Sequence, residues 1–493
     1  MGNKPHSAAA RKSMTPTTSN KSASRRLSRA GQLSRTNHGA PDSPVIMAPA
    51  AATLVAGLLL CVRYPGATQY AMAGLVLWAL CGSRQTIQAI SLSLLITFLN
   101  PEVVPPEPSV ALLKWLIFGI AALRLISVGL WRHAARQWAA PLICLAAVAL
   151  ASALGKGALT PLSILKLAVF LTGVSAFFTS LAGSKKSCRY WVDWFFTLHC
   201  VILLVSAPLL AIPAGRARNG TGFQGIFGHP QSLGVYLAFF TAFVTASWLS
   251  ANKLRLFTLA TIPVGWTFIV LSGCRTAVFA LLLAIAATAI TAITVRRDLI
   301  SEGPLRQMKR RLVPLGCLIA VMAGVLGGRA ADAVTSFTAK GTGVDESPAG
   351  LQEAYAISRG ALIENSMETF RQHPWIGGGF GLAAGRVTQN IDDDNSYGIP
   401  TSAPVEDGFL ISSILGQMGI LGLLSAGVIV VCVGARVLMR GSIPVIVLLF
   451  TALFINCGEM VFFSVGGLGS QMWMIIALCF GSVKLTDSPM SRH

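Results

Sequence analysis

The sequence predicts an all-α polytopic membrane protein with about 12–14 transmembrane helices. Of its 493 residues, 53% are hydrophobic and only 12% are charged, and the mean hydropathy is +0.65. Apolar stretches of about 15–25 residues, each near the length that crosses a bilayer, recur through most of the chain. Helix is the expected conformation, because lipid offers no hydrogen-bond partner to the edge of an open sheet.

The apolar stretches divide the chain into a series of segments. Residues 1–44 are rich in serine, arginine and lysine, and we expect a disordered, basic cytoplasmic tail. We expect helices 1–11 over 45–328, one large outer (periplasmic) loop over 329–407, helices 12–14 over 408–484 and a second cytoplasmic tail over 485–493. The expected spans are 45–62, 67–82, 86–99, 110–130, 138–154, 161–182, 190–212, 231–250, 255–272, 276–295, 313–328, 409–435, 442–462 and 466–483.

Basic residues are concentrated on one side of this predicted topology. With fourteen spans and the N-terminus in the cytoplasm, that side holds 26 of the 39 lysines and arginines. This is the positive-inside pattern, and it predicts that both termini are cytoplasmic. The net charge of +20 is therefore explained by membrane orientation, and no nucleic-acid partner is expected.

The ten cysteines and seven histidines predict neither a disulfide framework nor a metal site. Eight of the cysteines lie inside apolar stretches and no CxxC occurs, so buried packing is their expected role. The histidines are scattered, with no pair at ligand spacing. We expect no metal and no cofactor.

Arg275 is the most conspicuous charge in the apolar part of the chain. It stands in "LSGCRTAVFA" between two apolar runs, with no acidic residue near it in sequence, and faces outward in the predicted topology. One interpretation is an ordinary arginine that snorkels to the interface. The other is a fixed cation for an anionic ligand at the outer surface.

Another outward joint, "IPAGRARNGTGFQGIFGHPQSLGVY", carries Arg216 and Arg218 and ends in His229, just before an apolar run. Its glycines permit close backbone approach, and the N-terminus of a helix can receive an anion. A flexible loop of turn residues is the alternative interpretation.

The large outer loop has eleven acidic and five basic residues, a net charge of −6. Its middle, "AGLQEAYAISRGALIENSMETFRQ", contains Arg359 and has apolar residues at loosely helical spacing, which predicts one or two amphipathic helices. The following "HPWIGGGFGLAAGR" runs from His373 to Arg386, and predicts the helix end and a glycine turn.

Two adjacent carboxylates, Glu406 and Asp407, precede the next span in "TSAPVEDGFLISSILGQMGILGLL". Asp407 is a suitable N-cap for that helix, with Glu406 favourable to its dipole. Alternatively, one of the two is a base at the membrane entrance, with its pKa tuned by nearby arginines.

These four segments together resemble the O-antigen ligase and Wzy-type polysaccharide polymerase superfamily. The matching segments occur in the family's order over about residues 212–430: "RARNGTGFQGIFGHPQSLG", "LSGCRTA", "RGALIENSMETFRQHPWIGGGFG" and "EDGFLISSILGQMGILGL". The resemblance implies a GT-C-like helical bundle in the bacterial inner membrane. It also implies a polyprenyl (undecaprenyl) diphosphate-linked oligosaccharide as donor, and a chain-length regulator and a flippase as further partners.

The implied reaction is a metal-independent, inverting glycosyl transfer at the outer face of that membrane. Because arginine stays ionised and binds phosphate oxygens in a fork, Arg275, Arg359 and one of Arg216 or Arg218 are expected to hold the diphosphate.

The proton of the acceptor hydroxyl is expected to pass to Glu406 or Asp407, with Glu406 favoured because it occupies the place of the family's histidine. His229, His373 and Arg386 are secondary candidates for the site.

Two alternatives to a polymerase of lipid-linked repeat units remain. One is an O-antigen ligase that transfers the glycan to lipid A-core, but ligases of the family carry His-Asn where this chain has Glu406 and Asp407. The other is a polytopic transporter or flippase, although the sequence shows no repeated halves with paired broken helices. The polymerase is therefore the favoured prediction.

Overall fold

The computed structural model describes most of the chain, but some of the predicted features fall outside the described residues. Glu406, Asp407, Arg386 and the expected span 313–328 lie outside the described residues. The described residues are 44–64, 66–127, 135–154, 160–181, 185–218, 220–250, 256–297, 299, 310–311, 359–382, 409–463 and 467–483.

Every regular element over these residues is a helix, which confirms the all-helical prediction. Thirteen of the fourteen expected spans coincide with a helix. The remaining span, 313–328, lies outside the described residues. The α-helices are α2 (Pro44–Arg63), α3 (Ala67–Cys81), α4 (Ser83–Thr97), α5 (Ser109–Ser127), α6 (Ala135–Ala153), α7 (Thr160–Leu181), α8 (Lys185–Ser206), α9 (Pro230–Ser250), α10 (Leu256–Leu271), α11 (Arg275–Thr294), α16 (Ala361–Gln372), α17 (Leu410–Arg440), α18 (Ile443–Ile455) and α19 (Leu468–Ser482); the 3-10 helices are η3 (Ala207–Ala211) and η4 (Pro213–Gly215).

Six described helices are long and apolar enough to cross a membrane: α5, α7, α8 with η3, α9, α11 and α17. Six further apolar helices are shorter. Large apolar side chains are exposed on the outer faces of the bundle, such as Leu123 and Ile126 on α5 and Leu282 and Ile290 on α11. Many large apolar side chains exposed on long apolar helices are typical of helices that face lipid.

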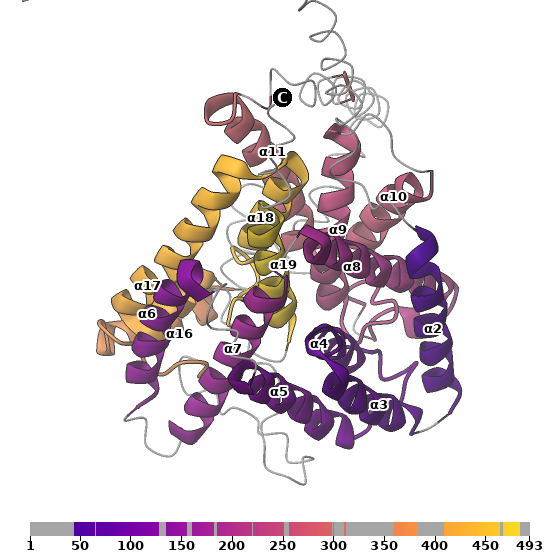
Figure 1. Ribbon diagram of the computed structural model, residues 1–493, viewed down its shortest axis with the longest axis horizontal. Helices are drawn as coiled ribbons and strands as arrows, with labels where there is room; N and C mark the ends of the chain where they lie inside the picture. The colour runs from indigo at the N-terminus through magenta and orange to yellow at the C-terminus, as the bar shows by residue number, and fades with distance from the viewer. Residues whose placement is uncertain are drawn as a thin grey trace, which may run out of the picture.

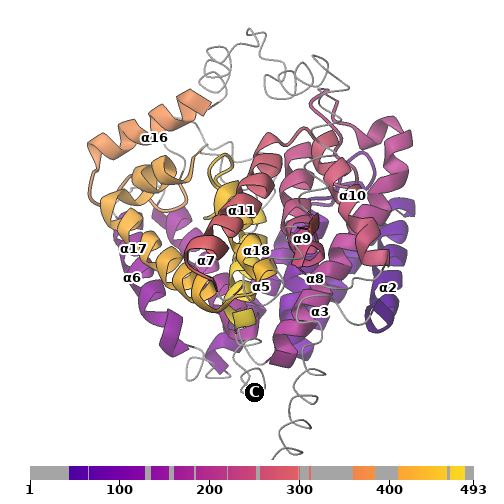
Figure 2. The same cartoon turned by 90° about the horizontal axis from the view of Figure 1, so that it is seen from above.

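The core of the bundle is built around α9, which is buried along nearly its whole length. It packs against α10, α11 and α18. Helices α18 and α19 are also mostly buried, whereas α2 and α17 lie at opposite edges of the molecule (Figures 1 and 2). Helix α16 runs along one edge beside the start of α17, as Figure 2 shows.

The polar joints gather at two ends of the bundle. At one end, Gly458 in the turn after α18 lies against Thr276 in the first turn of α11. At the other end, the guanidinium of Arg296, just after α11, donates hydrogen bonds to the carbonyls of Leu438 (3.0 Å) and Gly441 (3.1 Å) at the end of α17. We call these the Arg275 end and the Arg296 end.

Helix α17 is broken, whereas the sequence predicted one uninterrupted span over 409–435. Gly419 has φ 65° and ψ −163°, outside the helical region. The freed amides of Ile420 and Leu421 donate to the carbonyls of Pro374 (2.9 Å) and Trp375 (3.2 Å). A Cβ at position 419 would lie 2.4 Å from the Trp375 carbonyl carbon, so this approach requires glycine. The segment after α16 thus causes the break and hydrogen-bonds the amides that it exposes.

Candidate functional site

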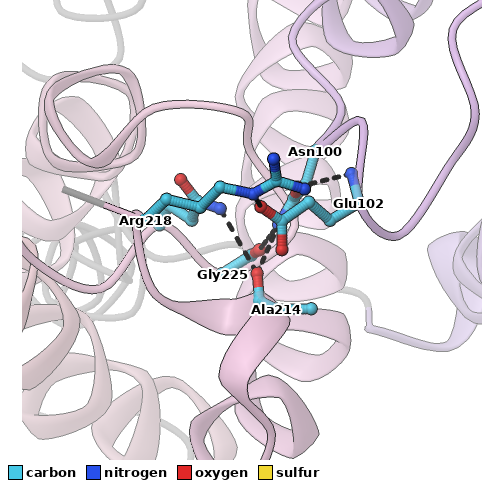
Figure 3. Close-up of polar contacts among 6 residues, drawn as sticks. Asn100, Glu102, Ala214, Arg218 and Gly225 are labelled. Atoms are coloured by element: carbon cyan, nitrogen blue, oxygen red, sulfur yellow. Dashed lines mark hydrogen bonds and ion pairs between the residues drawn. The ribbon is translucent and has the colours of Figure 1, made fainter. Parts of the chain in front are cut away.

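The joint between η4 and α9 is held in place by the buried side chain of Asn100, which follows α4 (Figure 3). The Asn100 side-chain amide donates to the carbonyls of Ala214 (2.6 Å) and Gly225 (3.3 Å). The Asn100 backbone amide donates to Ile226 (2.8 Å), and its side-chain oxygen accepts from the amide of Glu102 (3.0 Å). These hydrogen bonds hold the joint against the end of α4.

Arg216 and Arg218 both lie on the surface of this joint. Arg218 pairs with Glu102, Nε to Oε1 at 2.5 Å, and its side chain is 86% exposed. The backbone of Arg216 pairs with that of Phe223 in an isolated antiparallel bridge. An exposed ion pair such as Arg218–Glu102 contributes at most about 1 kcal/mol to stability.

The same joint touches the turn that precedes Arg275. The amide of Phe223 donates to the carbonyl of Leu271 (2.9 Å), the last residue of α10. Gly222 approaches so closely that a Cβ there would lie 2.3 Å from the Ser272 carbonyl oxygen. Ser272 is fully buried, and its hydroxyl accepts from the amide of Cys274 (3.2 Å). Arg275 therefore begins α11 at a fixed position against this joint.

Arg359, just before α16, forms an ion pair with Glu459, which lies in the turn after α18. Arg359 Nη2 is 2.7 Å from Glu459 Oε1, and the two side chains are 14% and 5% exposed. Thr276, the neighbour of Arg275, lies against Gly458, the neighbour of Glu459, so both charges are within electrostatic range of the half-buried guanidinium of Arg275. Arg275, Arg359 and Glu459 thus form one group at the Arg275 end, which we call the charge cluster.

The turn that carries Glu459 is fixed by Asn456, which is fully buried. The Asn456 side-chain oxygen accepts from the amide of Val461 (3.1 Å), and its amide group donates to Ala452 (2.8 Å). The amide of Glu459 itself donates to Ile455 (2.9 Å). Because the backbone on both sides of Glu459 is hydrogen-bonded, the carboxylate is presented from a rigid support.

Helix α16, which follows Arg359, is docked firmly onto α17. Ser366 in α16 is fully buried and lies against Gly416. Beyond α16, the amide of Gly378 donates to the carbonyl of Gly416 (2.6 Å). Phe380 is also fully buried, with its ring 5.5 Å from that of Phe170 and 5.4 Å from that of Phe463. Packing on both sides of the glycine-rich segment therefore sets the position from which Arg359 reaches Glu459.

The two described histidine candidates lie elsewhere. His229 is exposed, and its Nδ1 accepts from the amide of Gln231 (3.2 Å) at the start of α9. His373 is exposed at the C-cap of α16. It is fourteen residues beyond Arg359, roughly 20 Å along a helix. These positions favour a helix-capping role for His229 and separate His373 from the charge cluster.

Glu459 is the residue of the cluster that sequence reasoning missed. In the sequence it is a lone carboxylate within the apolar segment 442–462. Nothing in the sequence indicates which cation it contacts, because Arg359 is 100 residues away along the chain. Asn100 was missed in the same way, since the two carbonyls that its side-chain amide contacts, Ala214 and Gly225, are more than 110 residues distant.

Among the described residues, the charge cluster holds two guanidiniums and one carboxylate, whose charges sum to +1 when all three are ionised. Guanidiniums bind phosphate and carboxylate oxygens in a planar fork, and low solvent exposure strengthens such contacts. The arrangement is therefore suited to an anionic group at one end of an apolar bundle. A small apolar pocket between α6, α7, α17 and α19 has none of the three cluster residues in its lining.

Neither a protein-family model nor a curated protein sequence matches this chain. Its function is therefore argued from the charge cluster, the apolar bundle and the four segments that suggested a resemblance.

Proposed function

We propose that this protein polymerises polyprenyl-diphosphate-linked oligosaccharide repeat units into a surface polysaccharide, an exopolysaccharide or O-antigen. It acts as a glycosyltransferase of about 12–14 spans in a bacterial inner membrane, with both termini cytoplasmic and the Arg275 end at the outer face. The basic joints of the sequence, including those at the Arg296 end, support this orientation.

The observation that carries the proposal is the charge cluster. Arg275 and Arg359 come from two different segments of the proposed motif set, and both lie within electrostatic range of Glu459 at one end of the bundle. A lipid-linked donor presents its diphosphate at the membrane surface, where paired arginines can bind it. The proposal assigns the diphosphate to these two residues, with Arg216 or Arg218 as a further contact.

In the proposed reaction a hydroxyl of the acceptor sugar attacks the anomeric carbon of the donor glycan. A new glycosidic C–O bond forms as the C–O bond to the diphosphate breaks, so the anomeric configuration inverts. The electron pair leaves on the lipid diphosphate, whose growing charge Arg275 and Arg359 stabilise. The hydroxyl proton passes to Glu406. Helix α17 begins at Leu410 with Phe409 as its N-cap, so the proposal gives Asp407 no capping role.

A deletion strain tests the function directly. Cells without the protein should accumulate single lipid-linked repeats and lack long polysaccharide, and the wild-type gene should restore the polymer. Accumulation of complete polymer still attached to the lipid would instead identify the ligase alternative. Normal polymer in the deletion strain would exclude both.

The orientation has its own test. A reporter inserted near Asp345 should be active only if that reporter works outside the cytoplasm. Activity of a cytoplasmic reporter at this position would reverse the membrane orientation, and the proposed site would then face the wrong compartment.

Transport is the second candidate, and one feature bears on it. Transporters commonly bind substrate at paired broken helices. The described residues include a break in α17 at Gly419, but the amides just beyond it donate to Pro374 and Trp375. A break filled by the protein's own backbone supports packing more than substrate binding.

A further inference from the structure

A carboxylate buried inside a proposed diphosphate site competes with the diphosphate for the same guanidiniums. Glu459 is 5% exposed and contacts Arg359 at 2.7 Å. Its charge also acts on Arg275. When no ligand is bound, the Glu459 carboxylate therefore interacts with the same guanidiniums that a phosphate oxygen would contact.

We propose that Glu459 is the resident counter-ion of Arg275 and Arg359 and that a diphosphate replaces it when the donor binds. The identity of the natural donor rests on the proposed function, whereas the exchange of anions depends only on the three side chains. In this role Glu459 is a positioning residue. It offsets the repulsion between the two guanidiniums and keeps them together before the donor binds.

Charge explains why replacement is expected rather than simultaneous binding. A diphosphate ester brings at least two negative charges to a cluster whose net charge is +1. If Glu459 stayed ionised and in contact, like charges would lie a few ångströms apart where little water screens them. Arg359 lies at the start of α16, on a separate element from the rigid turn of Glu459, so the two side chains can part without disturbing the Asn456 hydrogen bonds.

The chain offers a matched control for this ion pair. Arg371 and Glu368, on α16 itself, form a second pair at 3.3 Å, with side chains that are 67% and 55% exposed. Both pairs join an arginine and a glutamate, but only the Arg359–Glu459 pair belongs to the charge cluster. Loss of the Glu368 carboxylate should not alter anion binding at the cluster.

The test uses the purified full chain in detergent with inorganic pyrophosphate as the probe, at constant ionic strength. We expect pyrophosphate to bind the wild type, and to bind Glu459→Gln at least about tenfold more tightly because the competing charge is gone. Without pyrophosphate, Glu459→Gln should melt at a lower temperature than the wild type, and pyrophosphate should raise its melting temperature more. Glu368→Gln should bind as the wild type does.

Equal or weaker binding by Glu459→Gln would overturn the exchange, and so would a wild type that fails to bind pyrophosphate. If Glu459→Gln does not fold, Arg359→Gln/Glu459→Gln removes both buried charges together and keeps the test open. This double variant should fold and bind pyrophosphate at least about tenfold more weakly than the wild type. Unchanged affinity in the double variant would also overturn the proposal.

Polymer formation in cells separates this proposal from the proposed function. If Glu459→Gln tightens pyrophosphate binding but the deletion strain still makes normal polymer, the anion exchange is supported and the polymerase proposal is refuted. If the deletion strain accumulates single repeats but Glu459→Gln binds pyrophosphate as the wild type does, the polymerase proposal is supported and the anion exchange is refuted.

Discussion

The arginines at the two ends of the bundle are used differently. At the Arg296 end, Arg296 donates to two backbone carbonyls near the end of α17, and the Arg436 guanidinium lies 4.5 Å from the centre of the Phe480 ring. At the Arg275 end, Arg359 contacts a carboxylate, and a second arginine lies within range of both. Carbonyls and rings are permanent partners that complete the fold. A carboxylate is an anion that another anion can replace.

The largest effect on polymer synthesis is expected for substitution of Glu406. Glu406→Gln should reduce polymer synthesis by about 10²–10⁴-fold, because an amide cannot take the proton of the acceptor hydroxyl. Asp407→Asn should be nearly silent, because the proposal places the base at Glu406 and the N-cap of α17 is Phe409. Polymer length and amount in a complemented deletion strain measure both.

Full activity of Glu406→Gln together with loss of activity in His229→Ala would move the base to the start of α9. That result would leave the diphosphate contacts unchanged, because they do not depend on which group takes the proton.

The next effect contrasts the two ends directly. Arg275→Ala should cost about 2–4 kcal/mol of transition-state stabilisation, and lysine should rescue it poorly because an ammonium lacks the guanidinium fork. Arg296→Ala should lower stability, while each folded molecule keeps its activity. The measurement is the initial rate with a lipid-linked repeat, normalised to folded protein. Equal rates in the two alanine variants would contradict the proposal that only the arginines at the Arg275 end take part in the reaction.

Helix α17 connects the two ends, and we expect glycine-to-alanine substitutions at its two ends to differ in their effect on stability. Gly419→Ala should destabilise the protein by about 2 kcal/mol or more, since the new Cβ would meet the Trp375 backbone at a positive φ. Gly434→Ala, nearer the Arg296 end, has nothing within 4 Å of the new Cβ and should be neutral or slightly stabilising. Thermal unfolding in detergent distinguishes the two, and comparable losses at both positions would contradict the broken helix.

The smallest effect is expected at Arg218. Because its pair with Glu102 is exposed, Arg218→Ala should change stability by at most about 1 kcal/mol, and high salt should remove most of the difference. The thermal shift of Arg218→Ala at low and high salt measures this. If polymerisation falls as steeply as in Arg275→Ala, Arg218 belongs with the diphosphate contacts after all.

The helices were predictable from sequence because each depends on a local property. An apolar run of sufficient length becomes a helix wherever the backbone has no other partner, and the expected span 231–250 differs from α9 by one residue. The surface position of Arg218 and the capping contact of His229 also follow from neighbours close in sequence or in the same joint.

The break in α17 and the charge cluster were not predictable in this way. The segment "GQMGILGL" contains three glycines, and only the approach of Trp375 selects Gly419 as the break. The contact between Arg359 and Glu459 joins residues 100 positions apart, so it depends on how α16, α17 and α18 pack. Glu406, Asp407 and Arg386 lie outside the described residues, and their roles stay predictions from the sequence.

The position of Glu459 along the chain has a consequence for synthesis. The ribosome makes Asn100 before the joint that it anchors, so that joint can take its shape as soon as it emerges. Arg275 and Arg359 are both made before Glu459, which follows Arg359 by 100 residues. A nascent protein truncated before residue 459 would hold both arginines without this carboxylate, so the cluster is completed only once residue 459 has been made.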